Sequence, residues 1–204
     1  MTEAVLRVRH FAEVRKFNSL VFPTFEAGIK FMHDLVKSRV YPASVRLMDN
    51  VQFRFASAFS SDGTSFLASL KQIISKFYLT KIKGFDISNI AIVTLLFEGS
   101  KEEIDYQEKM VYSIAARYNG VQGGEYNGKR GYQLTFLIAY IRDFVMSYNF
   151  IAESMETSVP WSKVNELCRN TKKNIEENAK RLGVKYKSFV TYRITLLYET
   201  VIFN

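Results

Sequence analysis

The run from Ile90 to Phe97 limits the possible folds most strongly, because it is almost entirely aliphatic. A strand that is apolar on both faces belongs in the middle of a sheet, with other elements covering each side. The run ends at Glu98-Gly99, and the Ser100 and Glu103 that follow form a capping-box pattern, which predicts the start of a helix. The sequence therefore predicts a central strand that leads directly into an amphipathic helix.

Alternating and helical periodicities predict the remaining elements. Strands are expected at residues 3–8, 19–22, 44–48 and 190–203, and further helices at 25–36, 66–77, 131–148 and 160–182. Asp49-Asn50 is expected to form a turn, and Phe53 to Gly63 a polar loop. Together these elements predict an α+β fold, in which helices pack on a mostly antiparallel sheet.

The composition is that of a folded domain with a basic surface. Of the 204 residues, 48% are apolar, which is sufficient for a substantial core, and the net charge of +8 favours anionic partners. The lone cysteine, Cys168, excludes an internal disulfide. No signal peptide is recognisable, and the apolar window Leu134 to Ile141 is too short to span a bilayer.

The strand patterns reach close to both ends of the sequence, at Glu3 and Phe203. Natural chains more often end in loosely held, exposed residues. We therefore expect residues 1–204 to be one domain cut from a longer protein.

Arg46 is the first candidate for a functional role. Val45 and Leu47 form one face of a short strand, and Arg46 lies on the other face. A buried guanidinium is costly without a partner, so Arg46 should meet water, a carboxylate or a bound anion. An ordinary salt bridge at the edge of a sheet is the simpler alternative.

Arg142 is the second candidate, within an apolar helix. Its neighbours include Ile141 and Phe144, so its head group is expected to be partly buried. Asp143 points about 100° away around the helix and is not its natural partner. Tyr148 or a bound anion would serve better, and a buried salt bridge is an equal alternative.

Other sequence patterns could suggest a phosphate loop, a metal site or a nucleophilic cysteine, but the residues do not support these sites. The stretch Gly123 to Arg130 contains Gly-x4-Gly-Lys, but Arg130 replaces the Ser or Thr of a phosphate loop, so a glycine-rich turn with two cations is expected. His10 and His33 have no ligands at metal-binding spacing, so no metal site is expected. Cys168 is expected in the core.

Several segments resemble the alkyl-dihydroxyacetonephosphate synthases, or alkylglycerone-phosphate synthases. The matching segments keep their order along nearly the whole chain. They are Pro42–Asn50, Phe77–Asp86, Ala91–Gly99, Gly124-Glu125 with Asn127-Gly128, Ile138–Asp143 and Glu153–Trp161.

The resemblance implies an FAD enzyme of the vanillyl-alcohol-oxidase fold class, built from a flavin domain and a substrate (cap) domain. Such enzymes exchange the acyl chain of acyl-dihydroxyacetone phosphate for a long-chain fatty alcohol, which creates the ether bond of ether lipids. Their flavin N5 forms a covalent adduct with the substrate, without net redox change. The chain would be a fragment of the cap domain, of the type found at the C-terminus of FAD-linked oxidases.

The resemblance also implies roles for individual residues. Arg46 matches a catalytic arginine beside the flavin, Arg142 matches an arginine that binds the substrate, and Met1 would contact the cofactor. FAD would be bound mainly by a domain absent from this chain, and the family's catalytic tyrosine would follow shortly after Tyr198. We therefore expect this polypeptide alone neither to retain FAD nor to catalyse the exchange.

The expected partners are acyl-dihydroxyacetone phosphate, a long-chain fatty alcohol and the FAD domain of the same protein. The resemblance further implies a homodimer in the full-length form, peripheral contact with a membrane and a peroxisomal location. Nucleic acid is not among the expected partners.

Three alternatives stay open at this point. The first is the cap domain of another FAD-linked oxidase acting on 2-hydroxy acids. The second is a basic RNA-binding module, for which Lys83-Gly84-Phe85 is a fragment of a signature, although Asp86 stands where a small residue is needed. The third is a truncated, non-catalytic paralogue that pairs with a full-length subunit.

Overall fold

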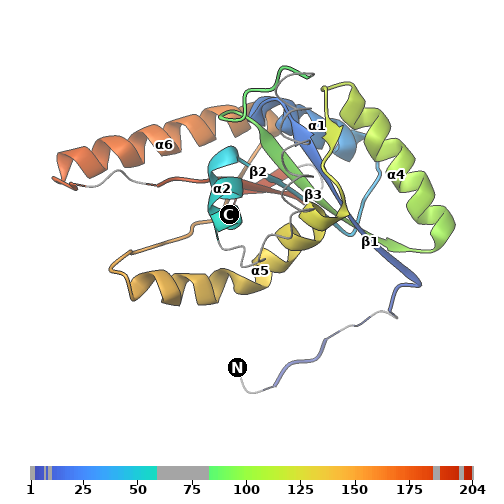
Figure 1. Ribbon diagram of the computed structural model, residues 1–204, viewed down its shortest axis with the longest axis horizontal. Coiled ribbons are helices and arrows are strands. Elements are labelled where there is room, and N and C mark those ends of the chain that lie inside the picture. Colours follow the sequence, from blue (N-terminus) through green and yellow to red (C-terminus); the bar gives the residue numbers. More distant parts are fainter. Residues whose placement is uncertain are drawn as a thin grey trace, which may run out of the picture.

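The fold is built on one antiparallel sheet (Figure 1). The computed structural model describes residues 3–6, 8, 11–58, 83–185, 189–197 and 200–203. Seven strands follow the order β4-β1-β3-β2-β6-β7-β5, and every pair of neighbours is antiparallel. The strands are β1 (Val14–Phe22), β2 (Ser44–Met48), β3 (Ala91–Gly99), β4 (Val121–Gln122), β5 (Thr157–Val159), β6 (Arg193–Leu197) and β7 (Thr200–Phe203).

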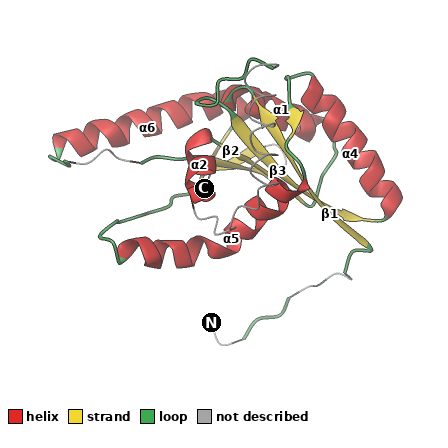
Figure 2. Cartoon of the chain, viewed as in Figure 1, coloured by secondary structure: helices red, strands yellow, loops and turns green. Residues whose placement is uncertain are grey.

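Helices cover both faces of the sheet (Figures 1 and 2). The helices are α1 (Phe25–Lys37), α2 (Asn50–Ala58), α4 (Lys101–Ala116), α5 (Glu125–Met146), α6 (Val164–Arg181) and the short 3-10 helix η2 (Trp161–Lys163). We call the side that α1, α4 and α6 cover the α1 face. The opposite side, on which α2 and the start of α5 pack, is the α5 face. No helix in the described ranges is both long enough and apolar enough to cross a membrane.

The main core lies on the α1 face. Leu20, Leu47 and Val93 project from three neighbouring strands into it and are almost fully buried. Phe31 of α1 packs there against Phe22, with ring centroids 4.9 Å apart. Each such buried side chain contributes about 1.5–3 kcal/mol to the free energy of unfolding, so this face supplies most of the stability.

A smaller core lies on the α5 face, because β3 is apolar on both sides. Ile92 of β3 and Met48 of β2 are buried there, together with Ile90 and Phe85. Phe53 of α2 packs against this cluster. The aliphatic run therefore occupies the covered centre of the sheet, as its composition predicts.

Two glycines let α5 approach the sheet closely. A Cβ atom on Gly128 would lie less than 3.0 Å from the backbone of Asn18 in β1, and one on Gly131 would meet Thr94 in β3 equally closely. The first turns of α5 therefore rest directly on β1 and β3. The Oγ of Ser19 donates a hydrogen bond to the carbonyl of Gly124, which fixes the chain just before the helix begins.

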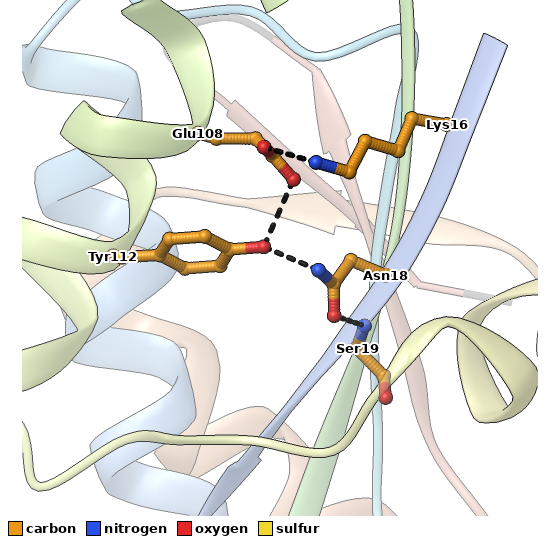
Figure 3. Close-up of polar contacts among 5 residues, drawn as sticks. All are labelled: Lys16, Asn18, Ser19, Glu108 and Tyr112. Atoms are coloured by element: carbon orange, nitrogen blue, oxygen red, sulfur yellow. Dashed lines mark hydrogen bonds and ion pairs between the residues drawn. The ribbon is translucent and has the colours of Figure 1, made fainter. Parts of the chain in front are cut away.

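A polar network holds β1 against α4 on the α1 face (Figure 3). Lys16 forms a 2.5 Å ion pair with Glu108, and the Tyr112 hydroxyl donates to the same carboxylate at 3.1 Å. Asn18 donates to the Tyr112 oxygen and accepts from the backbone N–H of Ser19. Burial, and next the charge of Glu108, raise the pKa of the Tyr112 phenol, so it stays protonated and acts as a donor.

The structure confirms the α+β class and most of the predicted elements. The predicted helix at 25–36 and strand at 44–48 correspond to α1 and β2, and the capping box of Ser100 and Glu103 is formed. Within the predicted strand at 190–203, the described residues form two antiparallel strands, β6 and β7, rather than one. The helix expected at 66–77 lies outside the described residues.

Three local expectations are wrong. The described residues from Glu3 to Leu6, with Val8, form no strand, because nothing in the described sheet pairs with them. Residues 50–58 form α2 instead of a turn and a loop, since the Asp49 carboxylate accepts the backbone N–H of Gln52 and caps the helix.

The third correction concerns the glycine-rich turn. Residues 125–130 are the first turns of α5 rather than a turn that presents two cations. Gly128 allows the helix to pack closely on the sheet. A glycine in a phosphate-binding pattern can serve either packing or ligand binding, and the sequence pattern alone does not distinguish the two.

Candidate functional site

Arg46 lies in the middle of the sheet on the α5 face. In the strand register it is opposite Thr94 of β3 on one side and Thr195 of β6 on the other. Its neighbours in β2, Val45 and Leu47, point into the main core, as the alternation of the sequence predicts. Arg46 therefore stands between two threonines in the register, with apolar packing on the other side of its strand.

Tyr132 of α5 holds the Arg46 guanidinium from one side. The Arg46 Cζ lies 5.5 Å from the centre of the Tyr132 ring, which is the geometry of a cation–π contact. Phe17 packs on the same ring with centroids 5.6 Å apart, and the Arg15 guanidinium lies 5.4 Å from it. Burial lowers the pKa of Arg46, and Tyr132 acts in the opposite direction. The guanidinium nevertheless remains charged, because arginine does not lose its proton in proteins.

A second arginine, Arg193 of β6, belongs to the same site. It is paired with Met48 in the register, so it lies on the α5 face diagonally across from Arg46. Burial lowers the pKa of Arg193, the charge of Arg46 lowers it further, and Glu156 counteracts both. Sequence analysis did not identify this residue. The alternation of Arg193, Ile194 and Thr195 would have indicated one polar face, but not which strand lies beside it.

Arg142 is not part of this cluster. It follows Tyr132 by ten residues on α5, which corresponds to about 15 Å along the helix axis. Its side chain is exposed, so the expected partial burial is wrong for this chain. The reason is that only the first part of α5 contacts the sheet, while the rest of the helix projects beyond it (Figure 1).

The projecting part of α5 carries a row of exposed aromatic side chains at every fourth position. Phe136 is 64% exposed and Tyr140 is 72% exposed, Phe144 continues the row on the helix, and Tyr148 follows just after the helix ends at Met146. The row starts from Tyr132, whose ring centroid lies 5.4 Å from that of Phe136. An apolar track therefore leads away from the two arginines.

The other candidates from the sequence are Met1, Cys168 and the histidines. Met1 lies outside the described residues. Cys168 is buried in the main core, as expected, and burial raises the pKa of its thiol to about 12, so it is no nucleophile at neutral pH. The His33 ring packs on Trp161 with centroids 5.3 Å apart. In the described ranges, no three His, Cys, Asp or Glu side chains are grouped so that they could hold a metal ion.

Comparison with known protein families identifies the family to which this fold belongs. Residues 12–198 match the family described as FAD linked oxidases, C-terminal domain. The chain belongs to this family. As an FAD-linked oxidase C-terminal domain, it has the sheet and the helical layers that the sequence predicts, so the expected fold class is confirmed.

The domain is similar to alkyldihydroxyacetonephosphate synthases. It is 42% identical to that of Caenorhabditis elegans over 199 residues, which cover 98% of this chain and 33% of that protein. It is 27% identical to that of Trypanosoma brucei brucei over 177 residues, or 87% of this chain and 29% of that protein. These similarities confirm the resemblance found in the sequence.

A solved structure of alkyldihydroxyacetonephosphate synthase has the same fold. The TM-score is 0.76 at 22% identity, and the match covers 96% of this chain and 36% of the other. The domain thus spans about a third of the length of the curated relatives it matches.

Proposed function

We propose that this domain is the cap portion of an alkylglycerone-phosphate synthase. The whole enzyme would exchange the acyl chain of acyl-dihydroxyacetone phosphate for a long-chain fatty alcohol and so make an ether lipid precursor. The identity of 42% over 98% of the chain with the synthase of Caenorhabditis elegans carries this proposal. Arg46, which the resemblance matches to a catalytic arginine, is half-buried on the α5 face, and this position supports the proposal.

The residues of the α5 face fit FAD as the cofactor. Arg46 and Arg193 offer N–H donors from one face of the sheet, and guanidinium groups suit the carbonyl and phosphate oxygens of a flavin nucleotide or of the substrate. When bound, the flavin supplies an electrophilic and nucleophilic centre for the exchange. We propose that most of its binding site belongs to another domain of the same protein, because this chain covers about a third of its relatives.

The arginines of this chain would position the reactants. Arg46 is held against Tyr132, so its donors keep one direction, and it would stabilise negative charge that develops on substrate oxygens. Arg142, exposed on α5, would bind the substrate from the projecting part of the helix once the rest of the enzyme covers it. Met1 would contact the cofactor at the opposite end of the chain.

The proposal is tested with the longer protein that contains this chain. The purified protein is incubated with FAD, acyl-dihydroxyacetone phosphate and labelled hexadecanol, and the ether product is measured. We expect product formation, and we expect Arg46→Lys to reduce the rate at least 100-fold, since lysine lacks the planar donor set. The matched variant Arg169→Lys, exposed on α6, should keep the wild-type rate. Absence of ether product from a protein that retains FAD would refute the proposal.

Location and assembly are further parts of the proposal. We infer a peroxisomal enzyme that is a homodimer and contacts the membrane peripherally. Fractionation of the source cells should place the native protein with peroxisomal markers, in a high-salt-extractable form. Its mass by light scattering should be twice that of one full-length polypeptide. A cytosolic, monomeric protein would contradict this part while leaving the chemistry unaffected.

A further inference from the structure

Two arginines are neighbours on the α5 face, one on β2 and one on β6. Arg46 is opposite Thr195, and Arg193 is opposite Met48, so the two arginines are diagonal neighbours on adjacent strands. Diagonal neighbours of this kind have Cα atoms about 7–8 Å apart. Two long side chains at that spacing can place their head groups on either side of one small ligand.

The surroundings of Arg193 leave part of its charge unsatisfied. Its Nε atom is fully buried, and among the described residues it has no hydrogen-bond acceptor. The described charges that act on it are Arg46, which repels it, and the exposed Glu156, which attracts it. A buried N–H of a charged group without an acceptor is costly, as is a like charge beside it. Both costs disappear if an oxyanion binds between the two arginines.

The neighbouring side chains define which anions fit. Tyr132 closes one side of Arg46, and the register places Thr94 and Thr195 on the other two sides. Thr94 is buried beneath Gly131 of α5 and Thr195 is partly buried, so the side chains that flank Arg46 in the register carry hydroxyl groups rather than carboxylates. Two guanidinium groups with hydroxyls match a tetrahedral phosphate, which accepts several hydrogen bonds at once.

We propose that Arg193 is a second anion-binding residue, which together with Arg46 binds one phosphate group of a small phosphate ester. Only the choice of ester rests on the proposed function, in which dihydroxyacetone phosphate forms one end of the substrate. The aromatic row on α5 begins at Tyr132 and leads away from this site, so a phosphate end and an apolar chain can be accommodated side by side.

The test uses the full 204-residue chain and measures binding by calorimetry at low salt. Inorganic phosphate and dihydroxyacetone phosphate are the probes, and ADP represents the pyrophosphate of a dinucleotide. We expect dihydroxyacetone phosphate to bind at least tenfold more tightly than ADP. Tighter binding of ADP would overturn the choice of a small ester. No binding of any probe would overturn the site.

Charge-removal variants separate this site from the basic surface in general. Arg193→Gln and Arg46→Gln should each weaken binding of dihydroxyacetone phosphate at least tenfold, because one of the two guanidinium groups is lost. Arg169→Gln removes the same charge from α6 on the opposite face and should change the affinity less than twofold. Equal weakening by all three variants would indicate non-specific attraction and overturn the proposal.

A stability measurement distinguishes binding from a structural role of Arg193. Without anion, Arg193→Gln should melt at the same temperature as the wild type or higher, because the repulsion with Arg46 is removed. Addition of 10 mM phosphate should raise the melting temperature of the wild type and of Arg193→Lys, but not that of Arg193→Gln. A lower melting temperature for Arg193→Gln with unchanged protection by phosphate would mean that the residue is structural.

Failure of this inference and failure of the proposed function give different results. Ether synthesis by the longer protein, with rates unaffected by Arg193→Gln, would refute the phosphate site and leave the function intact. Phosphate binding that depends on Arg193, in a protein that makes no ether product, would refute the function and leave the site intact.

Discussion

At the scale of single residues, Asp49 makes the stability of the domain depend on pH. Its carboxylate accepts the backbone N–H of Gln52 at 2.8 Å and so caps α2, and its own N–H donates to the carbonyl of Tyr192. Burial raises the pKa of Asp49 from 3.8 to about 6, although both backbone bonds and the charge of Lys172 favour the ionised form. Asp49 immediately follows Met48, the last residue of β2, so it stands at the junction between that strand and α2.

We predict that Asp49→Asn stabilises the domain at neutral pH. A raised carboxyl pKa means that the folded state binds the proton more tightly, so stability is highest below the unfolded value of 3.8 and is lost as pH rises through about 6. Asparagine keeps the oxygen acceptor for the N–H of Gln52 and carries no charge. The free energy of unfolding should increase by on the order of 1–2 kcal/mol at pH 7.5 and change little at pH 4.

Urea unfolding of both proteins between pH 4 and pH 8 checks this prediction. The difference between the two curves isolates Asp49, because all other titrating groups are shared. A difference in unfolding free energy that is constant with pH would show that the pKa of Asp49 is the same in the folded and unfolded states.

Tyr132 is predicted to support Arg46 through its ring rather than its hydroxyl. A cation–π contact of this geometry contributes about 0.5–2 kcal/mol. Tyr132→Leu should therefore lower the rate of ether synthesis by the longer protein about tenfold, whereas Tyr132→Phe keeps the ring and should stay within twofold of the wild type. Equal losses in both variants would instead assign the effect to the hydroxyl.

At the scale of elements, the placement of α5 decides the geometry of the site. The helix brings Tyr132 over β2 only because Gly128 and Gly131 let its first turns rest on β1 and β3. The rest of α5 leaves the sheet and carries the exposed aromatic row. One helix thus contributes both a packed wall of the arginine site and a projecting apolar surface.

We predict that Gly128→Ala destabilises the domain by about 1–3 kcal/mol. Alanine is the better helix former by about 1 kcal/mol, but its Cβ would overlap the backbone of Asn18, which cannot move without disturbing β1. Lys129→Ala, one residue further and exposed, is the matched control and should be neutral. Thermal unfolding compares the two, and a stabilised Gly128→Ala would mean that α5 does not lie against β1.

At the scale of the whole molecule, the described helices cover the two faces of the sheet unequally. The α1 face is covered by three helices, whereas the arginine cluster and the aromatic row on the α5 side are partly exposed. The curated relatives are about three times as long as this chain. A further domain that covers the α5 side would bury the aromatic row and enclose the arginines.

We predict that the 204-residue chain alone makes no ether product. After mixing with FAD and passage over a desalting column, the chain should retain less than a tenth of an equivalent of flavin, measured by absorbance. The reason is that the described residues offer hydrogen-bond donors to a flavin from one side only. Alkyl product formed by the purified chain with added FAD would contradict this. The mass of the native polypeptide, measured with an antibody to this chain, provides the independent control.

Local patterns in the sequence determined most of the architecture. The aliphatic run to Phe97 fixed the central strand, the capping box at Ser100 fixed the start of α4, and the alternation around Arg46 fixed which side of β2 is polar. These features depend on neighbours within a few residues, so periodicity and capping chemistry are sufficient to predict them. Short segments of the sequence, such as Pro42–Asn50, also carried the resemblance to the synthase family.

Only the tertiary structure decided which polar residues meet. Arg193 is 147 positions from Arg46 in the sequence and becomes its neighbour because β6 pairs with β2. Arg142 shares a helix with Tyr132 yet lies well away from the arginine pair, because the end of α5 leaves the sheet. Strand order and the course of a helix across a sheet depend on packing between distant segments, and no local pattern contains that information.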